Sequence, residues 1–217
     1  FFWIPSNITA LTTSKVSMND VLSDKNFKDS YQFLASSVKA TSYKELQKNS
    51  GNNSLVGADD GYPKKLWEAV SAVLPNVVEG EQVTSELRSL FKPPFMTFNY
   101  ASSIKSIRGR LKLTMQDEIA SKIAAVDLNS VKEKEQPIVE LLKTFSNSDD
   151  IKVLKTLQNQ VREKDLKFVK VDKGASLGSY LEVMIDASYG VQVENVLTDA
   201  FEPFVAAQDV VNGSFKA

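Results

Sequence analysis

Apolar residues that recur every three or four positions restrict the fold of this chain more than any other feature. One series is Leu111, Met115, Ile119 and Ile123, and another follows Pro63, at Leu66, Trp67, Val70, Val73 and Leu74. This spacing places the side chains on one face of an α-helix. We therefore predict a mainly α-helical chain, with a helix that begins at Pro63, stops at Pro75 and places Trp67 in the core.

Three further segments carry the same signal. A helix is predicted from Asn26 to Leu46, and Asp149 and Asp150 favour the start of another that carries Ile151, Leu154, Leu157 and Val161. Ser130 and Glu133 have the spacing of a capping box, in a segment that Pro137 divides. With 217 residues and 42% hydrophobic content, the chain can bury one large core or two small ones.

Two segments do not show helical spacing. Residues 47–62 are rich in Asn, Ser and Gly and predict a mobile loop, in which we interpret Asp59 and Asp60 as solvated turn residues and not as metal ligands. Residues 166–171 (LKFVKV) alternate in polarity and form the best candidate strand. We expect a two-stranded element at most.

The stretch from Thr84 to Lys112 has an unusual charge. Between Arg88 and Met115 it has no Asp or Glu and six basic residues: Arg88, Lys92, Lys105, Arg108, Arg110 and Lys112. The net charge of the whole chain is −1, so the rest of the chain is acidic. Such a local field selects for an anion, and phosphate is the usual one. The alternative is a solvated basic helix face that binds nothing.

The spacing within this stretch suggests how a phosphate would be held. Arg88 and Lys92 are one helical turn apart and can reach one ligand together, and Tyr100 offers a ring and a hydroxyl to a sugar or base. Pro93 and Pro94 follow directly, and proline is poorly tolerated inside a helix. We therefore expect one helix to end near Phe91 and a second to start at the prolines, with its positive end close to Lys92.

Composition excludes several kinds of site. The chain contains neither Cys nor His, which excludes disulfides, thiol chemistry, His-based triads and the usual zinc sites within it. No apolar run is long enough for a membrane span. The chain begins Phe1-Phe2-Trp3 without Met, and we expect it to be a fragment of a longer protein.

The pattern R-x-x-x-K-x-x-x-M-T-x-x-Y, formed by Arg88, Lys92, Met96, Thr97 and Tyr100, resembles motif B of the single-subunit phage-type DNA-directed RNA polymerases. The sequence of residues 92–100 (KPPFMTFNY) is most similar to that of the virion-packaged RNA polymerases of N-four-type phages. Residues 29–38 (DSYQFLASSV) also resemble the helix between motifs A and B. The resemblance implies the fingers and adjoining helices of a right-hand polymerase with palm, fingers and thumb.

Specific roles follow from the resemblance. Arg88 and Lys92 would hold the triphosphate of the incoming ribonucleotide, Met96 would contribute to nucleotide binding, and Tyr100 would sense the ribose 2′-hydroxyl. Arg88, Lys92 and Tyr100 would thus be the catalytic residues. Lys105, Arg108 and Arg110 would meet the backbone of the DNA template or the RNA product.

The resemblance also predicts the organisation of the chain. Residues 1–83 would lie between motifs A and B, residues 84–112 would form the motif B helices, and residues 113–217 a helical extension of the fingers and palm. Within that extension we predict a long helix over 178–211, interrupted at Pro203, and not a motif C strand containing Asp186. The ligands of the catalytic Mg²⁺ would then lie outside this chain, in the remainder of the polymerase.

On this interpretation the enzyme is a nucleotidyltransferase packaged in a bacteriophage virion and delivered into the host cytoplasm for transcription, and the 217 residues alone are inactive. A different class of function also fits the sequence. A non-catalytic helical phage structural or effector module could use the same basic helix to bind a partner.

Overall fold

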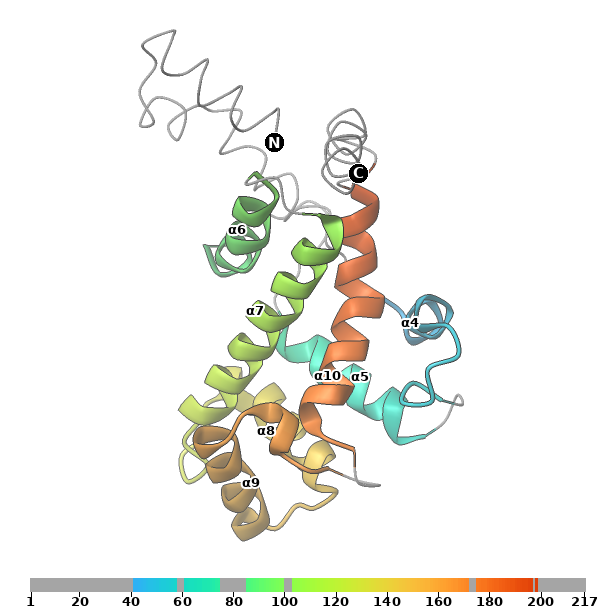
Figure 1. The fold of residues 1–217 in the computed structure, drawn as a ribbon. Coiled ribbons are helices and arrows are strands. Elements are labelled where there is room, and N and C mark those ends of the chain that lie inside the picture. The colour runs from blue at the N-terminus through green and yellow to red at the C-terminus, as the bar shows by residue number, and fades with distance from the viewer. Residues whose placement is uncertain are drawn as a thin grey trace, which may run out of the picture. The chain divides into compact units, whose positions relative to one another are not determined.

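The computed structural model in Figure 1 describes residues 41–57, 61–74, 85–99, 103–171, 175–196 and 198. Over these residues the chain is mainly α-helical, as the periodicity predicted, with seven α-helices and no β-strand. The α-helices are α4 (Tyr43–Ser50), α5 (Tyr62–Val73), α6 (Ser85–Asn99), α7 (Ile104–Ala125), α8 (Gln136–Ser146), α9 (Ile151–Glu163) and α10 (Leu177–Ile185). None of these helices is long and apolar enough to cross a lipid bilayer.

The described residues belong to two compact units. Unit 1 contains residues 85–99, 103–111, 190–196 and 198, and unit 2 contains residues 41–57, 61–74, 112–171 and 175–189. Helix α7 contributes its first turns to unit 1 and the remainder to unit 2.

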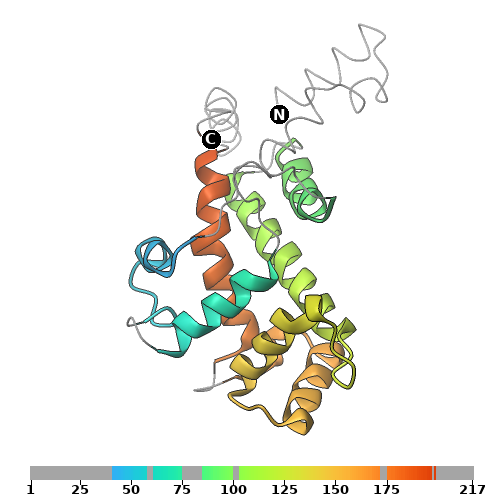
Figure 2. The ribbon, with the colours of Figure 1, turned by 180° about the vertical axis from the view of Figure 1, so that it is seen from behind.

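The core of unit 2 is built from the predicted apolar stripes. The side chains of Met115, Ile119 and Ile123 on α7 are fully buried, as are those of Leu66 and Trp67 on α5. Helix α8 packs against both α5 and α9 (Figures 1 and 2). Each such aliphatic side chain contributes about 1.5–3 kcal/mol through its burial, so these stripes supply most of the stabilisation of the unit.

Helix α4 departs from the sequence prediction. We expected one helix from residue 26 to 46, but Thr41 and Ser42 are not helical and α4 begins after them. Ser42 forms a capping box with Glu45: the Ser42 hydroxyl accepts a hydrogen bond from the Glu45 N–H, and the Glu45 carboxylate accepts one from the Ser42 N–H at 3.0 Å. The hydrogen bonds that this carboxylate accepts from the Ser42 N–H and from the Ser42 hydroxyl lower the pKa of Glu45. The expected helical residues before Thr41 lie outside the described residues.

Part of the predicted mobile loop is held in place by hydrogen bonds. Helix α4 extends to Ser50, and a turn then follows over residues 51–57. The Tyr43 hydroxyl donates to the carbonyl of Val56, and the side chain of Gln47 donates to the carbonyl of Gly57 at 2.7 Å. The loop prediction was therefore wrong for residues 47–50, which are helical. Residues 51–57 form a turn, as expected, and side chains of α4 donate hydrogen bonds to its backbone. Asp59 and Asp60 lie outside the described residues.

The candidate strand over residues 166–171 is also wrong. Leu166–Phe168 forms a 3-10 turn, η2, which the Asp165 side chain caps by accepting a hydrogen bond from the Lys167 N–H at 3.0 Å. Only an isolated antiparallel bridge joins Lys170 to Ser176. Leu166 and Val169 are buried whereas Phe168 is exposed, so burial follows a spacing of three and not of two.

The predicted helix starts have mixed outcomes. Asp150 caps α9, because its carboxylate accepts a hydrogen bond from the Lys152 N–H at 2.8 Å. The prediction of a capping box formed by Ser130 and Glu133 is wrong. The short 3-10 helix η1 (Glu133–Glu135) begins after Lys132, and the N–H of Lys132 donates to the Glu135 carboxylate at 3.0 Å. Helix α8 follows η1, with Pro137 in its first turn.

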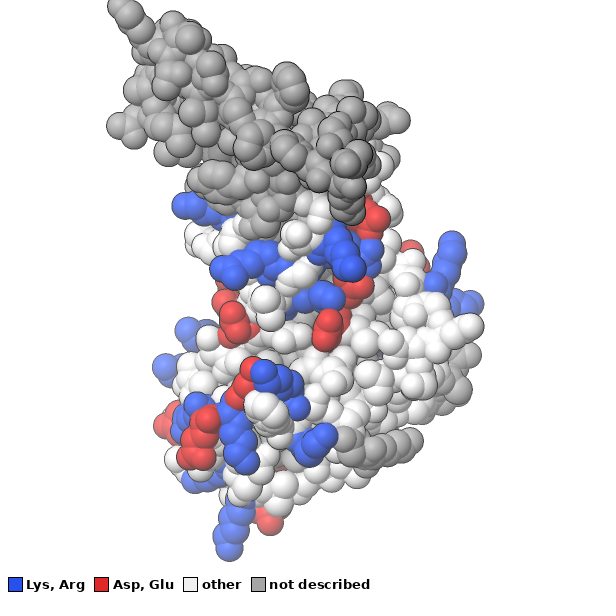
Figure 3. Space-filling view, viewed as in Figure 1, with Lys and Arg blue, Asp and Glu red and all other residues white. Residues whose placement is uncertain are grey.

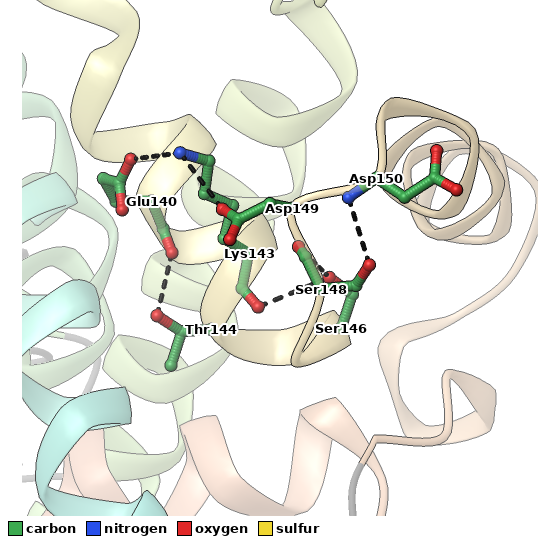
Figure 4. A network of polar contacts seen from close by, with 7 residues as sticks. All are labelled: Glu140, Lys143, Thr144, Ser146, Ser148, Asp149 and Asp150. Atoms are coloured by element: carbon green, nitrogen blue, oxygen red, sulfur yellow. Dashed lines mark hydrogen bonds and ion pairs between the residues drawn. The ribbon is translucent and has the colours of Figure 1, made fainter.

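A polar network shapes the corner between α8 and α9 (Figure 4). The Lys143 ammonium lies 2.8 Å from the Glu140 carboxylate and 3.4 Å from that of Asp149. These contacts, chiefly the one with Glu140, raise the pKa of Lys143. Asn147 ends α8 in the left-handed conformation that Asn tolerates well.

The segment from Gly178 is helical, as predicted, and does not form a strand at Asp186. Helix α10 is followed directly by a π-helical turn, Asp186–Gly190, and then by a helix that includes residues 191–196. The π turn is anchored in unit 2, where Asn49 donates to the carbonyl of Ala187 at 2.9 Å and Ser188 donates to Thr41 at 2.6 Å. Pro203 lies outside the described residues.

Side chains of α9 close the C-terminal end of α7. The buried amide of Gln158 donates to the carbonyls of both Ile123 and Val126 at 2.8 Å, and the guanidinium of Arg162 donates to the carbonyl of Ala124. The last carbonyls of an α-helix have no partner within the helix. Gln158 and Arg162 therefore supply the hydrogen bonds that α7 lacks at this end.

We predict that Gln158→Leu destabilises the protein by about 2–4 kcal/mol, because it leaves two buried carbonyls without a donor. Gln160→Leu is the matched control, since Gln160 lies on the same helix and its side chain makes no hydrogen bond with described residues. This control should change the free energy of unfolding by no more than about 0.5 kcal/mol. Urea denaturation of both variants measures the difference, and equal effects would contradict the capping role.

We also predict opposite effects of alanine at two helical glycines. At Gly178 an added Cβ would lie 2.9 Å from the backbone nitrogen of Lys167, so Gly178→Ala should destabilise the fold by about 1–3 kcal/mol. At Gly109 no atom would lie within 4 Å, and Gly109→Ala should stabilise α7 by about 0.5–1 kcal/mol. Thermal denaturation distinguishes the two variants. A higher melting temperature of Gly178→Ala would contradict the close approach of α10 to the backbone of Lys167.

Candidate functional site

Helix α6 runs without a break through Pro93 and Pro94. The expected break at Lys92 is therefore wrong, and the positive end of a second helix does not lie beside it. Each proline removes one backbone hydrogen bond, at a cost of about 3 kcal/mol or more inside a helix. The burial of one apolar face offsets this cost, because Leu87, Leu90, Phe91 and Pro94 are all buried at helical spacing.

The continuous helix places the candidate nucleotide-binding positions in a row. Positions 88, 92 and 96 lie on successive turns of α6, with about 6 Å between neighbours along the axis. The side chain of Lys92 is exposed and has no carboxylate partner among the described residues. The side chains of Arg88 and Met96, and the whole of Tyr100, lie outside what the structure describes.

The basic residues at the start of α7 are in two different environments. Lys105 and Arg110 are exposed, and Lys105 has no acidic partner among the described residues. Arg108 is partly buried and forms an ion pair with Glu194 in the helix that follows the π turn. Figure 3 shows Lys and Arg side chains gathered over the first turns of α7. Lys105 is thus exposed, whereas Arg108 is held in an ion pair.

The N-terminus of α7 adds to the positive field around Lys105. The Ser103 hydroxyl accepts a hydrogen bond from the Ser106 N–H at 3.3 Å, and the first turn contains no acidic residue. The first N–H groups of a helix carry partial positive charge, which an acidic residue normally offsets. Lys105 increases that charge instead, and the combination favours a phosphate.

Sequence reasoning missed the acidic partners of this region. The ion pair of Arg108 with Glu194 joins residues that are far apart in the chain, and Lys112 pairs with Glu182 on α10 at 3.0 Å. Neither pair has a local sequence signal. Among the described residues, no group of three Asp or Glu side chains could hold a metal ion.

Comparisons of the chain with protein families, with curated proteins and with solved structures found no match. The interpretation of the site therefore depends on its residues and geometry.

We predict that Lys105→Ala and Arg108→Ala have different effects. Lys105→Ala should weaken the binding of a single-stranded oligonucleotide and lower the slope of log affinity against log salt by about one, without changing stability. Arg108→Ala should lower the free energy of unfolding by up to about 1 kcal/mol, because it removes a partly exposed ion pair, and should change binding less. Titrations at several salt concentrations test both, and equal losses of affinity would contradict this division.

Proposed function

We propose that this chain is the fingers segment of a single-subunit DNA-directed RNA polymerase, where it binds the incoming ribonucleoside triphosphate and the template during RNA elongation. The observation that carries the proposal is the continuity of α6. It aligns positions 88, 92 and 96 of the motif B pattern along one side of a helix, with Lys92 exposed and without a carboxylate partner in the part of the chain that the structure describes.

The chemical role of α6 would be electrostatic. Arg88 and Lys92 would neutralise the charge that develops on the β- and γ-phosphates as pyrophosphate leaves. Arg offers a planar fork of donors and Lys a compact point charge, a suitable pair for a polyphosphate. Tyr100 would test the sugar for its 2′-hydroxyl. Mg²⁺, with ligands in the remainder of the polymerase chain, would supply the charge that organises the attacking and leaving oxygens.

The start of α7 would contact the nucleic acid. Lys105 and the N-terminal N–H groups of α7 offer a backbone phosphate a sequence-independent contact. Arg110 is exposed, and Arg108 is paired with Glu194; both already have partners and would exchange those contacts for the phosphate. The polymerase would belong to a phage virion and act in the bacterial host cytoplasm, with the DNA template and RNA product as its partners.

We predict that Lys92→Ala, in the complete polymerase, lowers nucleotide incorporation by on the order of a hundredfold, because it removes a charge that stabilises the transition state. Lys112→Ala is the matched control: it removes the same charge, but Lys112 is paired with Glu182. Single-turnover primer extension measures both rates. Equal and small effects would reject the polymerase assignment and favour a non-catalytic module with a solvated basic helix.

A further inference from the structure

Unit 2 contains a hollow that the proposed function does not use. It has a volume of about 560 Å³ and lies between the end of α8, one side of α9 and the segment at Lys170 and Val171. Ligand sites in proteins commonly have volumes of about 300–1,000 Å³. The hollow shares no residue with α6 or with the start of α7.

The floor of the hollow is apolar. Phe145 and Leu157 form its buried part, and Val171 is half-buried beside them. Val153 is also part of the lining, and 40% of its surface is exposed. This exposed aliphatic side chain provides a surface against which a flat ring could lie.

The rim of the hollow is cationic. Lys152 and Lys170 come from different elements, and no carboxylate is among the described lining residues. The nearby acidic residues of the α8–α9 corner have other partners. Asp149 forms an ion pair with Lys143, and Asp150 accepts a hydrogen bond from the N–H of Lys152. Lys152 has no acidic partner among the described residues. Lys152 is therefore the lysine of this rim that is available to a phosphate group, whereas Lys170 already has a partner.

One wall carries a neutral hydrogen-bonding group. The amide of Gln160 lines the hollow, is half-buried and makes no hydrogen bond with described residues, and Asn147 is also part of the lining. Side-chain amides can pair with the donor and acceptor edges of nucleic-acid bases.

From these features we propose that the hollow binds a nucleotide unit, with its base against Val153 and the Gln160 amide and its phosphate at Lys152. The unit could come from a single strand or from a free nucleotide, and the chemistry of recognition is the same for both. This site does not depend on the polymerase assignment.

The test is the binding of a labelled single-stranded oligonucleotide and, separately, of AMP to the 217-residue chain that carries Lys92→Ala and Lys105→Ala. These two substitutions remove the exposed lysines of α6 and α7, so that failure of the polymerase proposal and failure of this one are distinguishable. Lys152→Ala and Gln160→Leu should each weaken binding by about three- to tenfold. Lys44→Ala removes an equal charge from an exposed position on α4 and should leave binding unchanged.

The neutral substitution Gln160→Leu makes the test decisive, because non-specific attraction of a polyanion would not detect it. If only the oligonucleotide binds tightly, the natural ligand is a single strand. If AMP binds about as tightly, the natural ligand is a free nucleotide. Absence of binding by both ligands would overturn the proposal. Equal losses in Lys152→Ala and Lys44→Ala, with no loss in Gln160→Leu, would also overturn it, and thermal denaturation verifies that each variant is folded.

Discussion

The closure of the C-terminal end of α7 by α9 is the interaction on which the architecture of unit 2 depends. The buried amide of Gln158 donates to the carbonyl of Ile123 in α7 and to that of Val126 just after it, and Arg162 donates to that of Ala124. Because hydrogen bonds are directional, these contacts determine both where α7 ends and where α9 lies against it. Lys122 of α7 bonds the C-terminal end of α5 in a similar way, since its ammonium donates to the carbonyl of Val73 at 2.9 Å.

Other close contacts complete this arrangement. Gly178 allows the backbone of α10 to lie close to that of Leu166 and Lys167, because a Cβ at this position would clash with that backbone. At the other end of α10 the π turn directs the carbonyl of Ala187 toward Asn49. The apolar stripes provide most of the free energy of folding, but these contacts at the helix ends determine which stripes meet.

The course of α6 changes the physical basis of the proposed nucleotide site. If a helix had begun at the prolines, its free N–H groups would have contributed to phosphate binding at Lys92. Because Lys92 lies within a continuous helix, side chains must supply that charge. The helix terminus that is available belongs to α7, where Lys105 lies in the first turn. A run of basic residues is therefore not a uniform field, as the ion pair between Arg108 and Glu194 also shows.

The sequence by itself determined the features that depend on neighbouring residues: the stripes at Leu66–Leu74 and Leu111–Ile123, the cap at Asp150 and the mainly helical class. Tertiary structure decided the rest. The same alternation that predicts a strand at residues 166–171 became a 3-10 turn because Leu166 and Val169 had to reach the core together. Pro93 and Pro94 remained inside α6 because burial of the apolar face outweighed two lost hydrogen bonds. Both outcomes depend on whether distant residues cover the apolar face, and the local sequence does not show which of the possible spacings is buried.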